Sequence, residues 1–354
     1  MSGRAAGPEA REATFSGRWG MMLAMLGMAV GTGNIWRFPR IAATNGGGDF
    51  LIPWVVFLFS WSLPLILTEF ALGKAMRRGP VGAFGRLLGP GFRWMGGWVA
   101  FCASAIMFYY SVVTGWCLRY VWAAVAGEVP GREPGAFWEA FSGSPGALVT
   151  HLLAMGLAVA VVWRGVRGIE RAARVLMPTL FALIVLLALR AVTLPGAERG
   201  LEFLFRPDWD GLRDAEIWLN ALTQNAWDTG AGWGLIVSYA VYMRTREDTT
   251  LNAFMLGFGN NSVSLLAGIM VLCTVFSIRP EAAGEIVGAG NTGLTFTWMP
   301  QLFATIPLGR LFMALFFVAL LAAALTSLIS MVELAVRALT DGGMRRGPAI
   351  AVVA

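Results

Sequence analysis

The chain has 354 residues, of which 57% are hydrophobic and 14% charged, and its mean hydropathy is +0.65. Soluble proteins contain roughly 45–50% apolar and about 25% charged residues, so this composition excludes a water-soluble enzyme and a disordered chain. The net charge of +6 does not indicate a nucleic-acid partner, because the arginines are spread between apolar blocks and no basic run exceeds two residues.

Apolar blocks of membrane-spanning length follow one another along the chain. A spanning helix needs ~20 residues, so the chain has room for roughly eight. The blocks lie at 17–45, 49–73, 92–126, 147–163, 168–191, 216–243, 250–278 and 310–340. A weaker block between 281 and 305 is interrupted by glycines and a proline, and we expect a long loop with short helices there.

The connecting segments predict the orientation. Arginine and lysine are more numerous in the segments that share a side with the N-terminus. The positive-inside rule therefore predicts a multi-pass protein of the cell (inner) membrane with a cytoplasmic N-terminus. On this basis segment 1–16 is cytoplasmic, 192–215 and 279–309 are extracellular, and 341–354 is a cytoplasmic loop that leads into a further span.

Two of the spans contain glycines at their centres. The first span has Gly27, Gly31 and Gly33, and the sixth has Gly230 and Gly232. If the sixth span begins a second group of five, these glycines occupy matching positions, which is the pattern of a transporter binding site between broken helices. Close packing of unbroken helices is the alternative explanation.

Polar side chains within the spans favour the first explanation. Glu69 and Asp228 are placed deep in spans, where a carboxylate costs ~2.5–3.5 kcal/mol or more and is a functional candidate by default. Backbone groups freed at a helix break can satisfy them and can bind a cation or a substrate carboxylate. Close packing alone leaves both acids without partners.

Two later spans contribute neutral oxygen atoms. Asn260 and Ser264 are four residues apart and share a helix face, as do Ala323 and Ser327 with Thr326 beside them. A small cluster of neutral oxygens suits Na⁺. The alternative for each hydroxyl is a hydrogen bond to the carbonyl four residues earlier in its own helix.

Little in the sequence supports an enzyme. Cys102, Cys117 and Cys273 lie in apolar segments without metal-ligand spacing, and we expect buried thiols. His151 is the only histidine, so zinc sites and histidine-based catalysis have almost no raw material. We therefore predict that the protein is not an enzyme.

Several motifs together resemble the neurotransmitter:sodium symporter family, in its bacterial amino-acid transporter branch. The motifs are Gly31-Thr32-Gly33-Asn34-Ile35-Trp36-Arg37-Phe38-Pro39, Asn45-Gly46-Gly47-Gly48, Gly168-Ile169-Glu170-Arg171, Met177-Pro178-Thr179-Leu180 and Leu325-Thr326-Ser327. The resemblance is collinear over essentially the whole chain. It implies an all-α membrane protein with a LeuT-like inverted-repeat fold, in which 17–191 is the first five-helix repeat, 216–340 belongs to the second, and helices 1 and 6 are broken.

The resemblance also implies Na⁺-coupled uptake by alternating access, with two sodium sites. The first site would use Ala29, Asn34, Asp228 and Asn260. The second would use the carbonyls of Gly27, Val30 and Ala323 with the hydroxyls of Thr326 and Ser327.

A substrate pocket follows from the same resemblance. It would be lined by Met28, Ala29, Thr32, Gly33, Ile106, Tyr110, Trp227, Gly230, Trp233, Ser327 and Met331. Tyr110 matches the tyrosine that binds the substrate carboxylate. Because no acid replaces a glycine in the first span, where the family's monoamine transporters have one, we expect neutral, hydrophobic or aromatic amino acids as substrates.

Further positions match the family's gates and supports. The outer gate would use Arg37, Tyr110 and Trp227, and the inner gate Arg11, Tyr242 and Asp341. Glu69 would support the broken helices. Gly168 and Pro178 match a pattern that lets the inner half of helix 5 unwind, and an ordinary proline kink is the alternative.

The chloride-site positions of the family hold Trp54, Gln224, Asp228 and Ser264. A fixed carboxylate at Asp228 would supply the negative charge that chloride supplies in other members, so we expect no chloride requirement.

The family usually has about twelve spans, and the chain ends in what resembles the start of the ninth. We therefore expect a chain without the last four helices, and a fragment or a binding-only membrane protein without transport activity is the alternative.

Overall fold

The structure is a computed structural model that describes residues 14–131 and 133–354, and these residues form helices and no strands. Six helical segments are long and apolar enough to cross a membrane, namely Gly48–Met76, Pro90–Ala126, Pro145–Trp163, Gly165–Val192, Thr249–Ile278 and Gly309–Asp341. The first and sixth predicted spans are each divided into shorter helices. The all-α fold class is therefore the predicted one.

The six segments are built from the following elements. They are α3 (Gly48–Phe57) with the π-helical turn η2 (Leu58–Ser62) and α4 (Leu63–Met76), η3 (Pro90–Phe92) with α6 (Arg93–Ala126), α9 (Pro145–Trp163), α10 (Gly165–Val192), α14 (Thr249–Ile278) and α18 (Gly309–Asp341).

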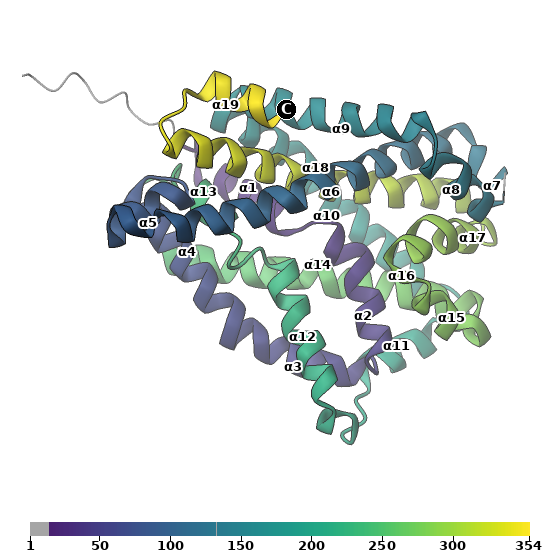
Figure 1. The fold of residues 1–354 in the computed structure, drawn as a ribbon. Coiled ribbons are helices and arrows are strands. Elements are labelled where there is room, and N and C mark those ends of the chain that lie inside the picture. The colour runs from purple at the N-terminus through teal and green to yellow at the C-terminus, as the bar shows by residue number, and fades with distance from the viewer. Residues whose placement is uncertain (1–13, 132) are drawn as a thin grey trace, which may run out of the picture.

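Both broken spans change direction at small residues (Figure 1). Helix α1 (Arg18–Ala29) ends where Val30 takes an extended conformation, and the chain continues through the π-helical turn η1 (Gly33–Arg37) into α2 (Phe38–Thr44). Helix α12 (Ala215–Asp228) is separated from α13 (Leu235–Ala240). In this gap Gly230 and Gly232 have φ of +67° and +86°, a region that glycine enters without steric cost.

Helices α14 and α18 form the centre of the bundle and are its most buried spans. Helix α18 packs along α6, and α10 packs against α1, α14 and α18. Helix α12 packs beside α3, and α13 beside α4. This arrangement brings the two helix breaks together between α6 and α18, where the main candidate site lies.

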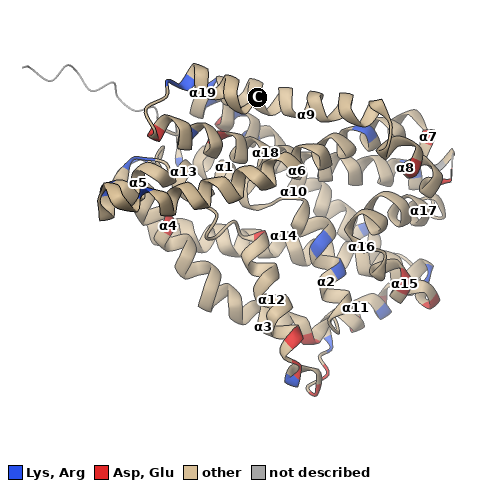
Figure 2. Cartoon of the chain, viewed as in Figure 1, with Lys and Arg blue, Asp and Glu red and all other residues tan. Residues whose placement is uncertain are grey.

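Short helices form the connections, and charged residues concentrate there. The short elements are α5 (Pro80–Leu88), α7 (Glu128–Gly131), α8 (Pro134–Ser142), α11 (Ala197–Phe205), η4 (Gly211–Arg213), η5 (Pro280–Ala282), α15 (Ala283–Gly288), α16 (Gly290–Thr292), η6 (Gly293–Trp298), α17 (Met299–Ala304) and α19 (Arg346–Val353). Figure 2 shows few charged positions along the middles of the long helices. This distribution is the one expected for a protein whose helices lie in lipid.

Candidate substrate and sodium sites

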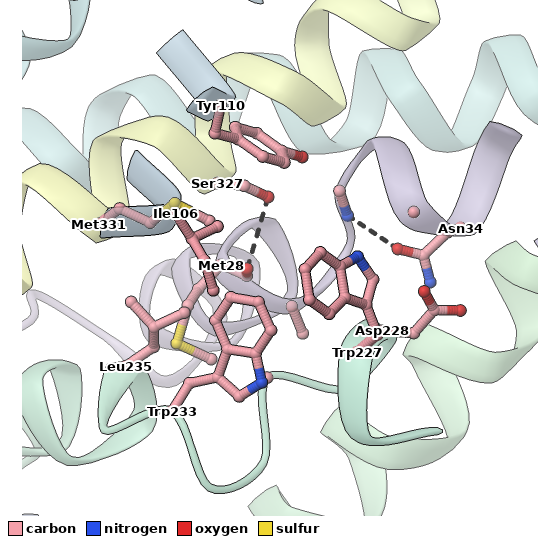
Figure 3. A pocket seen from close by; sticks show the side chains of 14 residues that line it. Met28, Asn34, Ile106, Tyr110, Trp227, Asp228, Trp233, Leu235, Ser327 and Met331 are labelled. Atoms are coloured by element: carbon pink, nitrogen blue, oxygen red, sulfur yellow. Dashed lines mark hydrogen bonds between the residues drawn. The ribbon is translucent and has the colours of Figure 1, made fainter. Parts of the chain in front are cut away.

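A cavity lies between the two helix breaks and is closed by α6 and α18 (Figure 3). Its lining residues are Met28, Ala29, Gly31, Gly33, Asn34, Ile106, Tyr110, Trp227, Asp228, Gly230, Trp233, Leu235, Ser327 and Met331. Every residue predicted to line the substrate pocket is in this set except Thr32, which is buried beside it. The additional lining residues are Gly31, Leu235 and the two predicted sodium ligands Asn34 and Asp228, and no sequence pattern singled out Leu235.

One end of the cavity is polar. The Tyr110 hydroxyl accepts hydrogen bonds from the Thr32 backbone N–H at 2.8 Å and from the Thr32 hydroxyl at 3.1 Å. A Cβ on Gly31 would lie 2.6 Å from the Tyr110 hydroxyl and 2.9 Å from the Ser327 hydroxyl. The chain therefore needs glycine at position 31 to bring its backbone against these two hydroxyls.

Asp228 is the last residue of α12, and its side chain is buried. Its Oδ2 accepts hydrogen bonds from the Ser264 hydroxyl at 3.1 Å and from the Gln224 amide. Its Oδ1 is fully buried and has no hydrogen-bond partner in the described part of the chain. A Cβ on Gly33 would lie 2.8 Å from this oxygen, so Oδ1 faces the break of the first span. An unpartnered buried carboxylate oxygen is costly, and a bound cation would satisfy it.

Two asparagines extend this arrangement into a network. The Asn34 amide nitrogen donates to Asn260 Oδ1 at 2.9 Å and to the Ser264 hydroxyl at 2.8 Å. Its Oδ1 accepts from the Gly31 backbone N–H at 2.8 Å. This network joins three of the predicted ligands of the first sodium site, Asn34, Asp228 and Asn260, which come from η1, α12 and α14. Amide oxygens with a single carboxylate form a donor set that fits a hard cation such as Na⁺.

The predicted second sodium site lies where α18 meets the end of α1. The Ser327 hydroxyl faces the carbonyl oxygens of Gly27, Met28 and Val30 at 3.4–3.5 Å. These distances exceed those of ordinary O–H···O hydrogen bonds, so the oxygens are gathered without being strongly bonded to one another. Neutral oxygens grouped in this way also fit Na⁺.

Thr326 is placed differently from Ser327. Its hydroxyl donates to the Ala322 carbonyl at 2.9 Å and to the Ala323 carbonyl at 3.1 Å. The contact with Ala322 is a hydrogen bond to the carbonyl four residues earlier in the same helix, which was the alternative to a sodium-binding role for this hydroxyl. Its Cβ is nevertheless close to the first span, because a Cβ on Gly27 would lie 3.0 Å from it.

Glu69 on α4 supports the break in the sixth span. Its carboxylate accepts hydrogen bonds from the backbone N–H groups of Gly232 at 2.6 Å, Gly234 at 3.4 Å and Val237 at 3.2 Å. These donors lie at the start of α13 and in the gap before it, where no preceding helical turn supplies acceptors. The carboxylate therefore replaces the missing turn.

The structure brings together three of the four chloride-site positions. Gln224 and Ser264 bind Asp228, whereas the buried indole N–H of Trp54 has no hydrogen-bond partner among the residues described. The Trp54 ring instead packs against Phe38, with ring centroids 4.7 Å apart. Trp54 therefore belongs to an apolar cluster and does not contribute a hydrogen bond to the group around Asp228.

Two of the predicted outer-gate residues, Arg37 and Trp227, lie next to this group. Arg37 donates to the Gln224 side-chain oxygen, and its guanidinium carbon lies 5.9 Å from the centroid of the Trp227 ring. Arg37 is thereby linked through Gln224 to Asp228.

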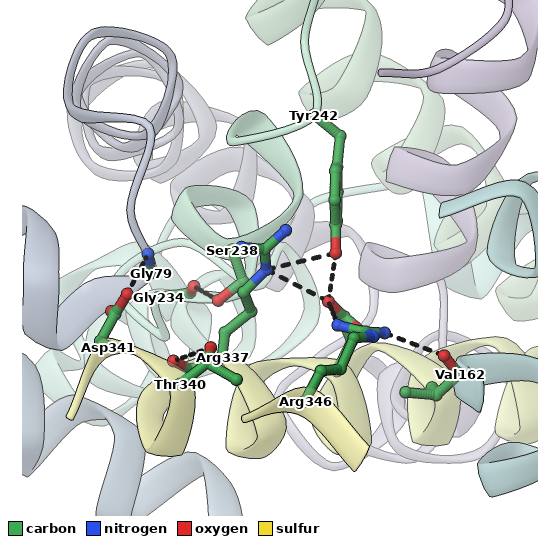
Figure 4. Close-up of polar contacts among 10 residues, drawn as sticks. Gly79, Val162, Gly234, Ser238, Tyr242, Arg337, Thr340, Asp341 and Arg346 are labelled. Atoms are coloured by element: carbon green, nitrogen blue, oxygen red, sulfur yellow. Dashed lines mark hydrogen bonds and ion pairs between the residues drawn. The ribbon is translucent and has the colours of Figure 1, made fainter. Parts of the chain in front are cut away.

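The structure describes two of the three predicted inner-gate residues, Tyr242 and Asp341. Arg11 is outside the described residues. The Asp341 carboxylate accepts hydrogen bonds from the backbone N–H groups of Gly79 at 3.2 Å and Gly82 at 2.8 Å, so it caps the N-terminus of α5 (Figure 4).

Glu333 is a functional candidate that the sequence analysis missed. It is completely buried in α18, accepts a hydrogen bond from the Tyr242 hydroxyl at 2.5 Å, and forms ion pairs with Arg346 at 2.6 Å and Arg337 at 3.3 Å. Figure 4 shows the three partners converging on one point. An isolated acid within an apolar span was the available signal, and it is the same signal that identified Asp228.

The fifth span is an unbroken helix in this structure. Helix α10 continues through Pro178, and Gly168 lies against the Val161 carbonyl at a point where a Cβ would not fit. Unwinding of this helix stays a prediction. Cys117 and Cys273 are buried as expected, but Cys102 is partly exposed and lines a second cavity together with Trp227 and Trp233. Within residues 14–131 and 133–354, no three His, Cys, Asp or Glu side chains form a metal-binding group.

Comparisons with known proteins agree with this geometry. The model of the sodium:neurotransmitter symporter family matches residues 11–144 and 142–346. The sodium-dependent transporter MJ1319 of Methanocaldococcus jannaschii is 34% identical, over 93% of this chain and 70% of that protein. The sodium-dependent transporter YhdH of Bacillus subtilis is 35% identical, over 96% of this chain and 75% of that protein.

A solved structure shares the fold. The crystal structure of MhsT in complex with L-phenylalanine superposes with a TM-score of 0.86 at 33% identity, covering 96% of this chain and 78% of MhsT. The predicted LeuT-like fold and family membership are therefore confirmed. The chain belongs to the sodium:neurotransmitter symporter family, a family of membrane transporters.

Proposed function

We propose that this protein is a sodium-coupled symporter that takes up neutral amino acids with hydrophobic or aromatic side chains, independently of chloride. The observation that carries the proposal is the unpartnered Oδ1 of Asp228, buried beside the break of the first span and next to the cavity. A buried carboxylate in this position has the charge and the access to bind a cation together with a zwitterionic substrate.

The cavity supports the proposed substrate class. The polar end at Tyr110 and Gly31 offers a hydroxyl and backbone groups to a substrate carboxylate. Apart from Asn34, Asp228 and Ser327, the remaining walls are formed by glycines and by apolar and aromatic side chains, of which Trp227 and Trp233 are the largest. None of the residues that the first span contributes to this lining is an acid, and we assign the acid that the sixth span contributes, Asp228, to the first sodium site. The phenylalanine complex of MhsT supports the same class.

The two oxygen clusters would hold sodium. Ala29, Asn34, Asp228 and Asn260 would form the first site, and Gly27, Val30, Ala323, Thr326 and Ser327 the second. Bound sodium supplies positive charge beside the substrate carboxylate. Because the ionised Asp228 carboxylate would supply a negative charge between Gln224 and Ser264, the first site would not need a chloride ion for charge balance.

Alternating access would use the two breaks as hinges. The outer side would close through Arg37 and Trp227, and the inner side would open where Asp341 and Tyr242 hold the helix ends. We further propose an inner-membrane location with the N-terminus in the cytoplasm, and an inner gate completed by Arg11. Unwinding of α10 between Gly168 and Pro178 would let water reach the second sodium site.

Equilibrium binding to the purified protein tests the proposal. Tritiated leucine, phenylalanine and tryptophan are measured by scintillation proximity in sodium chloride, sodium gluconate and choline chloride. We expect saturable binding in both sodium salts and none in choline. Dopamine competing more strongly than the amino acids, or binding lost in gluconate, would overturn the proposed substrate class or chloride independence, respectively.

A further inference from the structure

The break in the sixth span leaves backbone groups unpaired on both of its sides. Glu69 satisfies the N–H groups on the α13 side. On the α12 side, the last helical hydrogen bond joins the Thr229 N–H to the Asn225 carbonyl at 3.2 Å. The next carbonyl, that of Ala226, accepts instead from the indole N–H of Trp233 at 2.9 Å. The two sides of the break are therefore capped by two different side chains.

Trp233 also forms part of the cavity wall. Its ring packs edge-to-face against Trp227, with centroids 5.1 Å apart and an interplanar angle of 78°. Figure 3 shows the two indoles adjacent in the cavity, with Asp228 beside Trp227. The carbonyl that Trp233 caps belongs to Ala226, the residue directly before Trp227 and Asp228. One side chain thus contacts the substrate cavity and fixes the helix end that carries the cation-binding acid.

We infer that Trp233 is a positioning residue whose indole N–H holds the carbonyl end of α12, so that Trp227 and Asp228 keep the orientation that sodium and substrate require. This inference rests on the proposed function. Without the cap, this partly buried carbonyl has no partner and the end of α12 samples other orientations. The apparent dissociation constant equals the intrinsic one divided by the fraction of molecules in the binding-competent orientation, so affinity falls as this fraction falls. If Trp233 were only an apolar wall, ring size alone would matter.

Two substitutions at this position separate the hydrogen bond from the ring. Trp233→Phe removes the N–H and shortens the ring. Trp233→β-(3-benzothienyl)alanine keeps the bicyclic shape and replaces the N–H with sulfur. Trp218→Phe is the matched control, because the Trp218 indole donates to the Leu212 carbonyl at 2.9 Å at the far end of the same helix, outside the cavity lining.

Sodium half-saturation and leucine affinity are measured on the full chain, together with hydrogen exchange of residues 226–234 without ligands. We expect both Trp233 variants to weaken sodium and leucine binding together by about 3- to 10-fold and to exchange faster in this segment. The Trp218 variant should stay within about twofold of the parent protein.

Three outcomes would overturn the inference. They are parental affinities in the benzothienyl variant, Trp233 variants that match the Trp218 control, or unchanged hydrogen exchange in residues 226–234. A parent protein that shows no sodium-dependent binding would instead refute the proposed function, and the exchange measurement would still test the cap.

Discussion

Removing the negative charge of Asp228 should have a specific effect on sodium affinity and on its dependence on chloride. Asp228→Ser removes a buried carboxylate whose Oδ1 has no partner among the described residues and whose Oδ2 is bound by Gln224 and Ser264. A cation within about 4 Å of a unit negative charge gains about 4 kcal/mol at an effective dielectric of about 20, which corresponds to roughly a thousandfold in affinity. We therefore expect sodium affinity to fall by at least about 100-fold in chloride-free buffer.

Chloride should reverse this loss. With the carboxylate gone, the Gln224 amide and the Ser264 hydroxyl are free to donate to an anion in the same place. The assay is sodium-dependent leucine binding in gluconate and in chloride. The parent protein should bind equally in both, whereas Asp228→Ser should recover sodium affinity only as chloride is added.

A control variant removes another buried acid. The Asp49 carboxylate accepts a hydrogen bond from the Asp208 backbone N–H at 2.5 Å, away from the cavity. Asp49→Asn should leave the sodium affinity and its independence of chloride unchanged. The reasoning is refuted if Asp228→Ser retains parental sodium affinity in gluconate, or if the parent protein itself requires chloride.

Three further substitutions test other parts of the site. Glu69→Gln replaces a charge-assisted acceptor of three backbone N–H groups. In a thermal-shift assay the melting temperature should therefore fall by an amount equivalent to roughly 2–4 kcal/mol. An unchanged melting temperature would contradict the supporting role of Glu69. Tyr110→Phe removes the hydroxyl from the polar end of the cavity, and leucine affinity should fall about 5- to 100-fold. Because the buried Thr32 N–H also loses its acceptor, the melting temperature should fall by an amount equivalent to about 1–3 kcal/mol. Parental leucine affinity in this variant would contradict the role given to Tyr110. Gly31→Ala places a methyl group 2.6 Å from the Tyr110 hydroxyl, so sodium-dependent binding should be lost in a protein that still folds, and retained binding would show that this backbone does not meet the substrate.

The main features of the fold were predictable from the sequence. Continuous apolar blocks predicted the unbroken spans, and central glycines predicted both breaks. The acids within spans identified Asp228 and Glu69, because a carboxylate in lipid needs a specific partner. Family resemblance added the residues that line the cavity, including Met331, which composition and periodicity alone would not single out.

Other features depend on three-dimensional contacts that the sequence does not encode locally. Trp54 has a chloride-site position in the family pattern, yet its ring packs on Phe38 and does not bond to the acid. Asp341 caps α5, which precedes it by some 260 residues. The indole of Trp233 bonds to a carbonyl that is available only because the helix is broken. In each case the partner is set by how the chain packs in three dimensions and not by residue type.

Uptake into proteoliposomes tests the central claim most directly. Vesicles containing the purified protein and potassium inside are diluted into sodium buffer with labelled leucine or phenylalanine, with and without a sodium ionophore. The account predicts accumulation above the external concentration that collapses when the ionophore dissipates the sodium gradient. Sodium-dependent binding without any accumulation, or accumulation that is indifferent to the gradient, would contradict it.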